Sequence, residues 1–183
     1  MMVRIPARDG GEFSAYLTTP LKGKGPAVVV LEDGDPRKIC DWLASRQITA
    51  LCPELVKTND DQSADEVGFC IEFLRKHETC TGRVGVVGYG WGGLIAYLTA
   101  VRHRPDAAVC YYGVGIEKKL DLAKDLSCHM LMHYGAPAEV VEQVRTAFQD
   151  DLRVTVREYP AATADLADMR TLAFFIERLV GAR

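Results

Sequence analysis

The chain has 183 residues, of which 48% are hydrophobic and 26% charged, and its formal net charge is −3. This length and apolar content predict one folded domain over residues 1–183 with a substantial core. The mild negative charge, without a basic stripe, argues against nucleic acid or a membrane surface as partner. No run reaches the roughly 20 apolar residues of a spanning helix, and the start lacks the apolar core of a signal peptide, so we expect a cytoplasmic protein.

Strand and helix patterns alternate along almost the whole chain. Short β-branched or alternating runs predict strands at 12–17, 26–31, 48–52, 83–87, 107–112, 130–134 and 152–159. Helical patterns follow at about 36–46, 94–100, 138–148 and 165–180, and the apparent capping box Ser63-Ala64-Asp65-Glu66 predicts a helix reaching about Lys76. The polar stretch 57–63 before that motif is interpreted as a solvated loop without a function.

This alternation predicts right-handed crossovers and an α/β fold, a three-layer α/β/α sandwich with a mostly parallel sheet. Ligands of such sheets bind beyond the carboxyl ends of the strands. The candidate site therefore includes the residues that follow the strands, namely Glu32, Asp33, Glu54, 88–91, Gly113, 135–138 and 160–165.

The six cysteines are widely spread, and no two form a C-x-x-C pair. This spacing predicts free thiols in the core and no zinc site. His129 and His133 would share one face of a strand but lie about 13 Å apart at ~3.3 Å per residue, too far to hold one ion. We expect neither a metal nor a cofactor.

The most informative segment is Gly88-Tyr89-Gly90-Trp91-Gly92-Gly93, between a predicted strand and a predicted helix. It has the frame of a nucleophile elbow, in which small residues flank a reactive residue on a sharp turn. The central position is Gly90, which has no side chain. The same segment also satisfies G-x-G-x-x-G, so nucleotide binding is an alternative; the next strand, however, ends in Tyr111-Tyr112-Gly113, without the acid that would hold a ribose.

The elbow belongs to a wider ordered pattern spanning roughly residues 10 to 180. Its pieces are Val28 to Gly34, Ala50-Leu51-Cys52-Pro53-Glu54-Leu55, Val86 to Gly93, Ala107 to Gly113, Met132-His133-Tyr134-Gly135 and Tyr159-Pro160-Ala161-Ala162. With these motifs the chain resembles the dienelactone hydrolase family of α/β-hydrolases. The resemblance implies that fold, and an activity on small lactones or esters.

Members of that family use a Cys, Asp and His triad, with the Glu at the end of an early strand controlling protonation of the thiol. By resemblance the three positions are Gly90, Ala138 and Ala164, all chemically inert. A shifted alignment would offer Glu139 or Asp165 as the acid, but no histidine lies beyond His133. We therefore predict a non-catalytic binding or partner module, a pseudoenzyme, which takes a small carboxylate or lactone-like ligand or a protein partner.

The first alternative is an enzyme of altered mechanism on small lactones or esters, in which Glu32 or Cys52 acts; nucleotide binding is the second. The residues expected to face a ligand are Glu32, Asp33, Tyr89, Gly90, Trp91 and His133. Each has a plainer interpretation. Glu32 would be satisfied by loop amides, the aromatic residues would belong to the core, and His133 would be a packed histidine.

Overall fold

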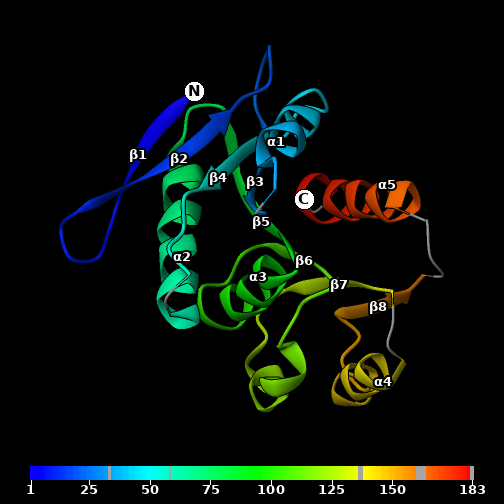
Figure 1. Ribbon diagram of the computed structural model, residues 1–183. Helices are drawn as coiled ribbons and strands as arrows, with labels where there is room; N and C mark the ends of the chain where they lie inside the picture. Colours follow the sequence, from blue (N-terminus) through cyan, green and yellow to red (C-terminus); the bar gives the residue numbers. More distant parts are fainter. Residues whose placement is uncertain (33, 58, 136–137, 160–163, 182–183) are drawn as a thin grey trace.

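The structure, a computed structural model, describes residues 1–32, 34–57, 59–135, 138–159 and 164–181 (Figure 1). Its strands are β1 (Met2–Pro6), β2 (Glu12–Thr18), β3 (Gly25–Leu31), β4 (Thr49–Pro53), β5 (Cys80–Tyr89), β6 (Ala107–Tyr111), β7 (His129–Tyr134) and β8 (Val154–Glu158). Its α-helices are α1 (Pro36–Ala44), α2 (Asp60–Lys76), α3 (Trp91–Arg102), α4 (Ala138–Ala147) and α5 (Ala164–Phe175). Short helical turns are η1 (Ile116–Lys118), η2 (Leu120–Asp125) and η3 (Ile176–Val180).

The strands form one sheet in the order β1-β2-β4-β3-β5-β6-β7-β8. The pairs β1–β2 and β2–β4 are antiparallel, and every pair from β4 to β8 is parallel. The predicted mostly parallel α/β architecture is thereby confirmed. Because the parallel strands run the same way, their carboxyl ends lie along one edge of the sheet.

Helices cover both faces of the sheet, as the two hydrophobic clusters show. One cluster joins α2, α3 and α4 to one face, and the other joins α1 and α5 to the opposite face (Figure 1). Strand β3 is buried along its whole length. Its side chains alternate, so that Val28 and Val30 belong to the α1 and α5 cluster while Val29 and Leu31 belong to the other.

The first half of the chain differs from the sequence-based expectations in two places. The edge strand β1 was not predicted, and it pairs with β2 in register from Met2↔Tyr16 to Pro6↔Glu12. Helix α2 begins at Asp60, before the expected capping box. The cap is Asn59, whose side chain accepts a hydrogen bond from the Gln62 amide at 3.1 Å, and two acids follow in the first turn, where the helix dipole favours them.

The predicted loop at 57–63 is therefore a helix start over its second half. Ser63, expected to cap the helix, lies inside it with its hydroxyl 3.4 Å from the Val56 carbonyl oxygen. Asp60 also has a specific partner, because its carboxylate accepts a hydrogen bond from the Trp91 indole at 2.8 Å. This bond ties the start of α2 to the start of α3, at the carboxyl edge of the sheet.

Candidate active site

The turn between β5 and α3 has the backbone of a nucleophile elbow. Gly90 holds φ +55° and ψ −117°, a strained combination that glycine adopts most easily. A Cβ at Gly88 would overlap the Gly92 carbonyl, and one at Gly92 would overlap the Leu31 carbonyl, so both flanking positions require glycine. A Cβ at Gly90, in contrast, would meet no heavy atom within 4 Å. The turn keeps an open space at the position that would carry a nucleophile.

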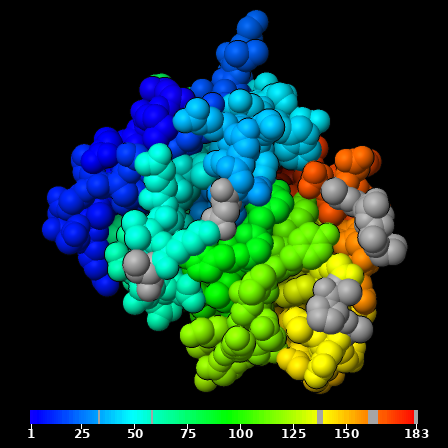
Figure 2. Space-filling model, viewed as in Figure 1, coloured from blue at the N-terminus to red at the C-terminus, as the bar shows by residue number. Residues whose placement is uncertain are grey.

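The two residues next to Gly90 line two different pockets. Trp91 lines the first, with a volume of about 260 Å³, which we call the Glu32 pocket. Tyr89 lines the second, about 210 Å³, which we call the Asp168 pocket. Figure 2 shows the light-blue surface of α1 beside the red and orange surface of α5 and the green surface of the elbow segment.

The Glu32 pocket collects the polar groups that follow β3 and β4. Its wall includes Glu32, Gly34, Cys52, Glu54, Lys57 and Trp91. Glu32 is half-buried just after β3, while Glu54 and Lys57 are exposed. The structure therefore brings together three residues named from the sequence, Glu32, Cys52 and Trp91. Asp33, also predicted to face a ligand, lies outside the described residues.

Cys52 is the thiol of this pocket, and it is only 6% exposed. Burial raises its pKa to about 11, against the opposing effect of a hydrogen bond from the Glu32 backbone. The thiol is therefore protonated at neutral pH. Because the thiolate is the nucleophile, Cys52 is a weak one in this environment.

Trp91 is held in place at the start of α3. Besides the indole bond to Asp60, the Lys57 ammonium lies 5.2 Å from the centre of its ring. The backbone N–H groups in the first turn of a helix have no intrahelical acceptor and favour negative charge. The amide of Trp91, directly after the open position at Gly90, is such a donor.

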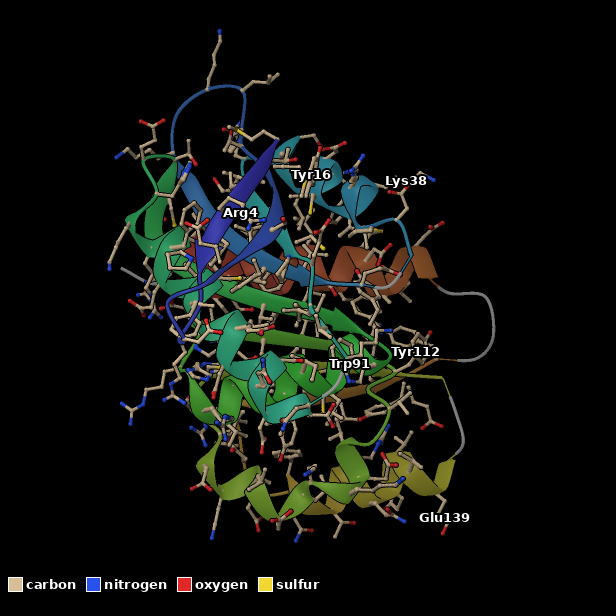
Figure 3. The ribbon with its side chains drawn as sticks, turned by 60° about the vertical axis from the view of Figure 1, so that its left-hand side comes forward. Arg4, Tyr16, Lys38, Trp91, Tyr112 and Glu139 are labelled. Atoms are coloured by element: carbon tan, nitrogen blue, oxygen red, sulfur yellow. The ribbon has the colours of Figure 1, made fainter. Side chains whose placement is uncertain are left out.

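Trp91 and Tyr112 lie toward the same end of the sheet, together with Lys38 of α1 (Figure 3). Tyr112 follows β6 with φ +48°, a left-handed conformation that is rare for an aromatic residue, and its side chain is 47% exposed. Its backbone N–H donates to the His133 carbonyl oxygen at 2.8 Å. This hydrogen bond helps to stabilise the left-handed backbone conformation of Tyr112.

The two later positions assigned by resemblance, Ala138 and Ala164, are the first residues of α4 and α5. Their neighbours Glu139 and Asp165, which a shifted alignment would use, are both exposed. Residues 160–163, which precede the position assigned to the histidine at Ala164, lie outside the described residues. Among the described side chains, no group of three or more acids, cysteines and histidines is arranged to hold a metal ion.

His133 is fully buried and engaged at both ring nitrogens. Nδ1 lies 2.8 Å from the Tyr159 hydroxyl, and Nε2 lies 2.9 Å from the Thr171 hydroxyl. Burial, together with the charges of Arg170 and Arg157, lowers its pKa to about 4, so the ring is neutral at pH 7. This geometry favours the plainer of the two interpretations, a packed histidine.

Tyr89, expected to face the same ligand as Glu32, lines the Asp168 pocket instead. It stacks on Tyr111 with ring centres 4.4 Å apart, and Tyr111 lies 4.4 Å from the His133 ring. The register explains this, because Tyr89 pairs with Tyr111 and Tyr111 with His133 across three parallel strands. The three rings form a ladder on the α1 and α5 face.

Two residues of α5 complete this ladder, and the sequence did not single them out. Asp168 accepts a hydrogen bond from the Tyr111 hydroxyl at 2.8 Å, and Thr171 lies 2.6 Å from the same hydroxyl. Their spacing of three residues places both on one face of the helix. That spacing is common to every helix, so by itself it carries no functional signal.

The elbow after the central strand of a mostly parallel sheet, with helices on both faces, defines an α/β-hydrolase fold. The chain matches the model of the dienelactone hydrolase family over residues 46–167, and it belongs to that family. Within the described part of the chain, no helix has both the length and the apolar character to cross a membrane.

Relatives of known name and structure agree with this assignment. The chain is 29% identical to a carboxymethylenebutenolidase of Pseudomonas sp. strain P51, covering 86% of this chain and 81% of that one. It is 28% identical to carboxymethylenebutenolidase 1 of Cupriavidus pinatubonensis, covering 81% and 76%. The crystal structure of a candidate dienelactone hydrolase from Klebsiella pneumoniae has a TM-score of 0.87, with 24% identity and 97% and 98% coverage.

Proposed function

We propose that this protein is a hydrolase of altered mechanism that opens small lactones or esters by direct attack of water in the Glu32 pocket. The observation that carries the proposal is the half-buried Glu32 carboxylate in one pocket with Trp91, the residue that directly follows the open position at Gly90. The name of the two carboxymethylenebutenolidases points to a small unsaturated lactone that carries a carboxylate. Lys57 at the exposed side of the pocket supports such a substrate, because its ammonium attracts a carboxylate.

In this mechanism a water molecule takes the space that a side chain at position 90 would fill. Glu32 accepts a proton from the water as its oxygen bonds to the carbonyl carbon. The carbonyl oxygen becomes negative and receives a hydrogen bond from the Trp91 amide. When the bond from carbon to the ring oxygen breaks, Glu32 returns the proton to the leaving oxygen, and the products are the acid and the alcohol or enol.

The thiol of Cys52 is the alternative nucleophile, and its surroundings count against it. With a pKa of about 11, only roughly one thiol in 10⁴ is ionised at pH 7. Water activated by a carboxylate needs no thiolate. Glu32 is therefore assigned the chemical role, and Cys52 a place in the wall.

The test is hydrolysis of a small unsaturated lactone by the purified protein and three variants. We expect Glu32→Gln to lower kcat about 10² to 10⁴-fold, the usual contribution of a general base. Glu54→Gln removes a carboxylate from the same pocket and should change kcat by less than about threefold. Cys52→Ala should likewise retain most of the activity. Full activity in Glu32→Gln, with a large loss in Cys52→Ala, would replace the water mechanism by the thiol one.

A second candidate, a binding module without turnover, is favoured by the absence of a side chain at Gly90. Three of the four histidines also hydrogen-bond elsewhere, His77 to Thr79, His103 to Asp65 and His133 in the core. Saturable binding of a small carboxylate or lactone without any hydrolysis would support this candidate. The six free buried cysteines suit a reducing compartment, and we propose the cytoplasm as the place of action in either case.

A further inference from the structure

The Asp168 pocket is a second cavity that the hydrolytic proposal does not use. It lies between α1 and α5, and its lining shares no residue with that of the Glu32 pocket. Most of its wall is apolar or aromatic, with Ile39, Leu43, Val87 and Phe175 around the Tyr89 and Tyr111 rings. A cavity of about 150 Å³ with apolar walls binds benzene, so about 210 Å³ is enough for one substituted ring.

The polar side of this pocket is a chain of hydrogen bonds whose direction can be worked out. The Tyr111 hydroxyl donates its one proton to Asp168, so at the 2.6 Å contact with Thr171 the threonine must be the donor. Thr171 then has no proton for His133, and Nε2 of the neutral ring must donate to it. Nδ1 therefore accepts from the Tyr159 hydroxyl.

Every donor in this chain thus points toward Asp168, which ends it. Among the residues that the structure describes, Oδ1 of Asp168 has Tyr111 as its partner and Oδ2 has no hydrogen-bond partner. This chain of hydrogen bonds therefore offers an incoming molecule an acceptor, a carboxylate oxygen, and no proton. Lys38 also lines the pocket, but it is exposed and its ammonium lies 3.4 Å from the Asp35 carboxylate. A carboxylate oxygen beside an apolar cavity favours a ligand that brings its own donor.

From this geometry we propose that the Asp168 pocket binds a single aromatic ring carrying one hydrogen-bond donor, of which phenol is the simplest example. The ring packs against the tyrosine pair and the aliphatic wall, and its hydroxyl donates to Oδ2 of Asp168. The site is independent of the hydrolytic proposal, because it uses the other side of the elbow.

The experiment compares binding of phenol and anisole to the whole protein by titration calorimetry. The two rings are alike, but anisole has no proton to donate, so phenol should bind at least about tenfold more tightly. Asp168→Asn should reduce that preference to less than about threefold, while Ile39→Trp, which fills the cavity, should weaken both ligands more than tenfold. Glu54→Gln, in the other pocket, should leave both affinities within twofold.

Equal binding of phenol and anisole to the wild-type protein would overturn the proposal, as would unchanged phenol binding in Ile39→Trp. Circular dichroism and a melting curve for each variant separate loss of the site from loss of the fold. Because calorimetry needs no turnover, the two proposals fail separately. Lactone hydrolysis without phenol binding overturns only this one, and phenol binding without hydrolysis overturns only the first.

Discussion

The two pockets beside Gly90 differ in how their polar groups are satisfied. In the Glu32 pocket a half-buried carboxylate and a protonated thiol lie near exposed charges, within reach of water. In the Asp168 pocket the tyrosine, threonine and histidine groups form a continuous buried chain that ends at one carboxylate. The first arrangement suits hydrolysis of a substrate in a pocket that water can enter. The second suits stability of the fold and recognition of a ligand that carries a hydrogen-bond donor.

The comparison also shows which residues hold the elbow in shape. The elbow is held by Gly88 and Gly92, which allow the close backbone approach, and not by a side chain at position 90. Glycine at that position relieves the strain that another residue would carry there. The frame of the elbow, and the buried network beside it, therefore do not depend on a side chain at position 90.

The largest effect should come from placing a Cys, Asp and His triad at the three positions assigned by resemblance. We expect the triple variant Gly90→Cys, Ala138→Asp and Ala164→His to hydrolyse a small activated ester at least about 10³-fold faster than the wild type, since a working triad contributes up to about 10⁶-fold. Initial rates on an activated ester measure this gain. Gly90→Cys alone is the matched control, and it should gain little because its thiol has no base.

A folded triple variant with no gain would show that positions 138 and 164 do not face position 90. Alkylation with iodoacetamide gives a second reading of the same geometry. The thiol at position 90 should react faster in the triple variant than in the single one, because a nearby imidazole lowers the pKa of a thiol.

The buried network makes a prediction about acid. The pKa of His133 is about 4 in the folded protein and about 6.5 when unfolded, so the unfolded chain binds the extra proton between these values. The neutral, buried His133 therefore contributes fully to the free energy of unfolding above about pH 6.5. This contribution, roughly 3 kcal/mol in total, is lost as the pH falls to about 4. Urea unfolding at several pH values measures it.

His133→Gln keeps one donor and one acceptor but cannot be protonated, so it should flatten that dependence between pH 6.5 and 4. His77→Gln, at a partly exposed position just after α2 and hydrogen-bonded to the uncharged Thr79, serves as the control and should keep it. An unchanged slope in His133→Gln would assign the acid sensitivity to other groups.

The sheet could be predicted from the sequence because its strands are strongly patterned. An apolar run such as Gly25–Leu31, which is buried along its whole length, is typical of a central strand in a parallel sheet. Strand β1 was missed because an edge strand with one fully buried residue, Ile5, shows little pattern. The start of α2 was misplaced because Ser63 to Glu66 matches a capping box better than the single Asn59 that caps the helix.

The candidate site was predicted unevenly for a related reason. Positions at the ends of parallel strands converge by topology, so Glu32, Cys52 and Trp91 could be expected to meet. Which face a strand residue takes depends on register, and this separates Tyr89 and His133 from Glu32. Asp168 and Thr171 lie on a helix, where partners across the interface are set by tertiary packing alone.

The smallest effect expected here is a difference between two buried tyrosines. One donates its hydroxyl proton to the Asp168 carboxylate, and the other donates to a backbone carbonyl. Tyr111→Phe removes a hydrogen bond to a carboxylate and deprives Thr171 of its acceptor, so it should cost about 2 kcal/mol of unfolding free energy. Tyr97→Phe is a matched control on the opposite face, where a buried tyrosine donates to the Lys119 carbonyl at 2.9 Å. It should cost about 1 kcal/mol, since its partner is uncharged.

Both substitutions keep the ring and its packing, so the difference between them isolates the charge of the acceptor. Urea denaturation at pH 7, where His133 is neutral, gives the two values under one condition. A loss of unfolding free energy in Tyr111→Phe no larger than that in Tyr97→Phe would contradict this expectation. That result would mean that water hydrogen-bonds to Asp168 as favourably as the tyrosine hydroxyl does. The pocket would then be wetter than its apolar lining indicates, and a phenol hydroxyl would gain little by displacing that water.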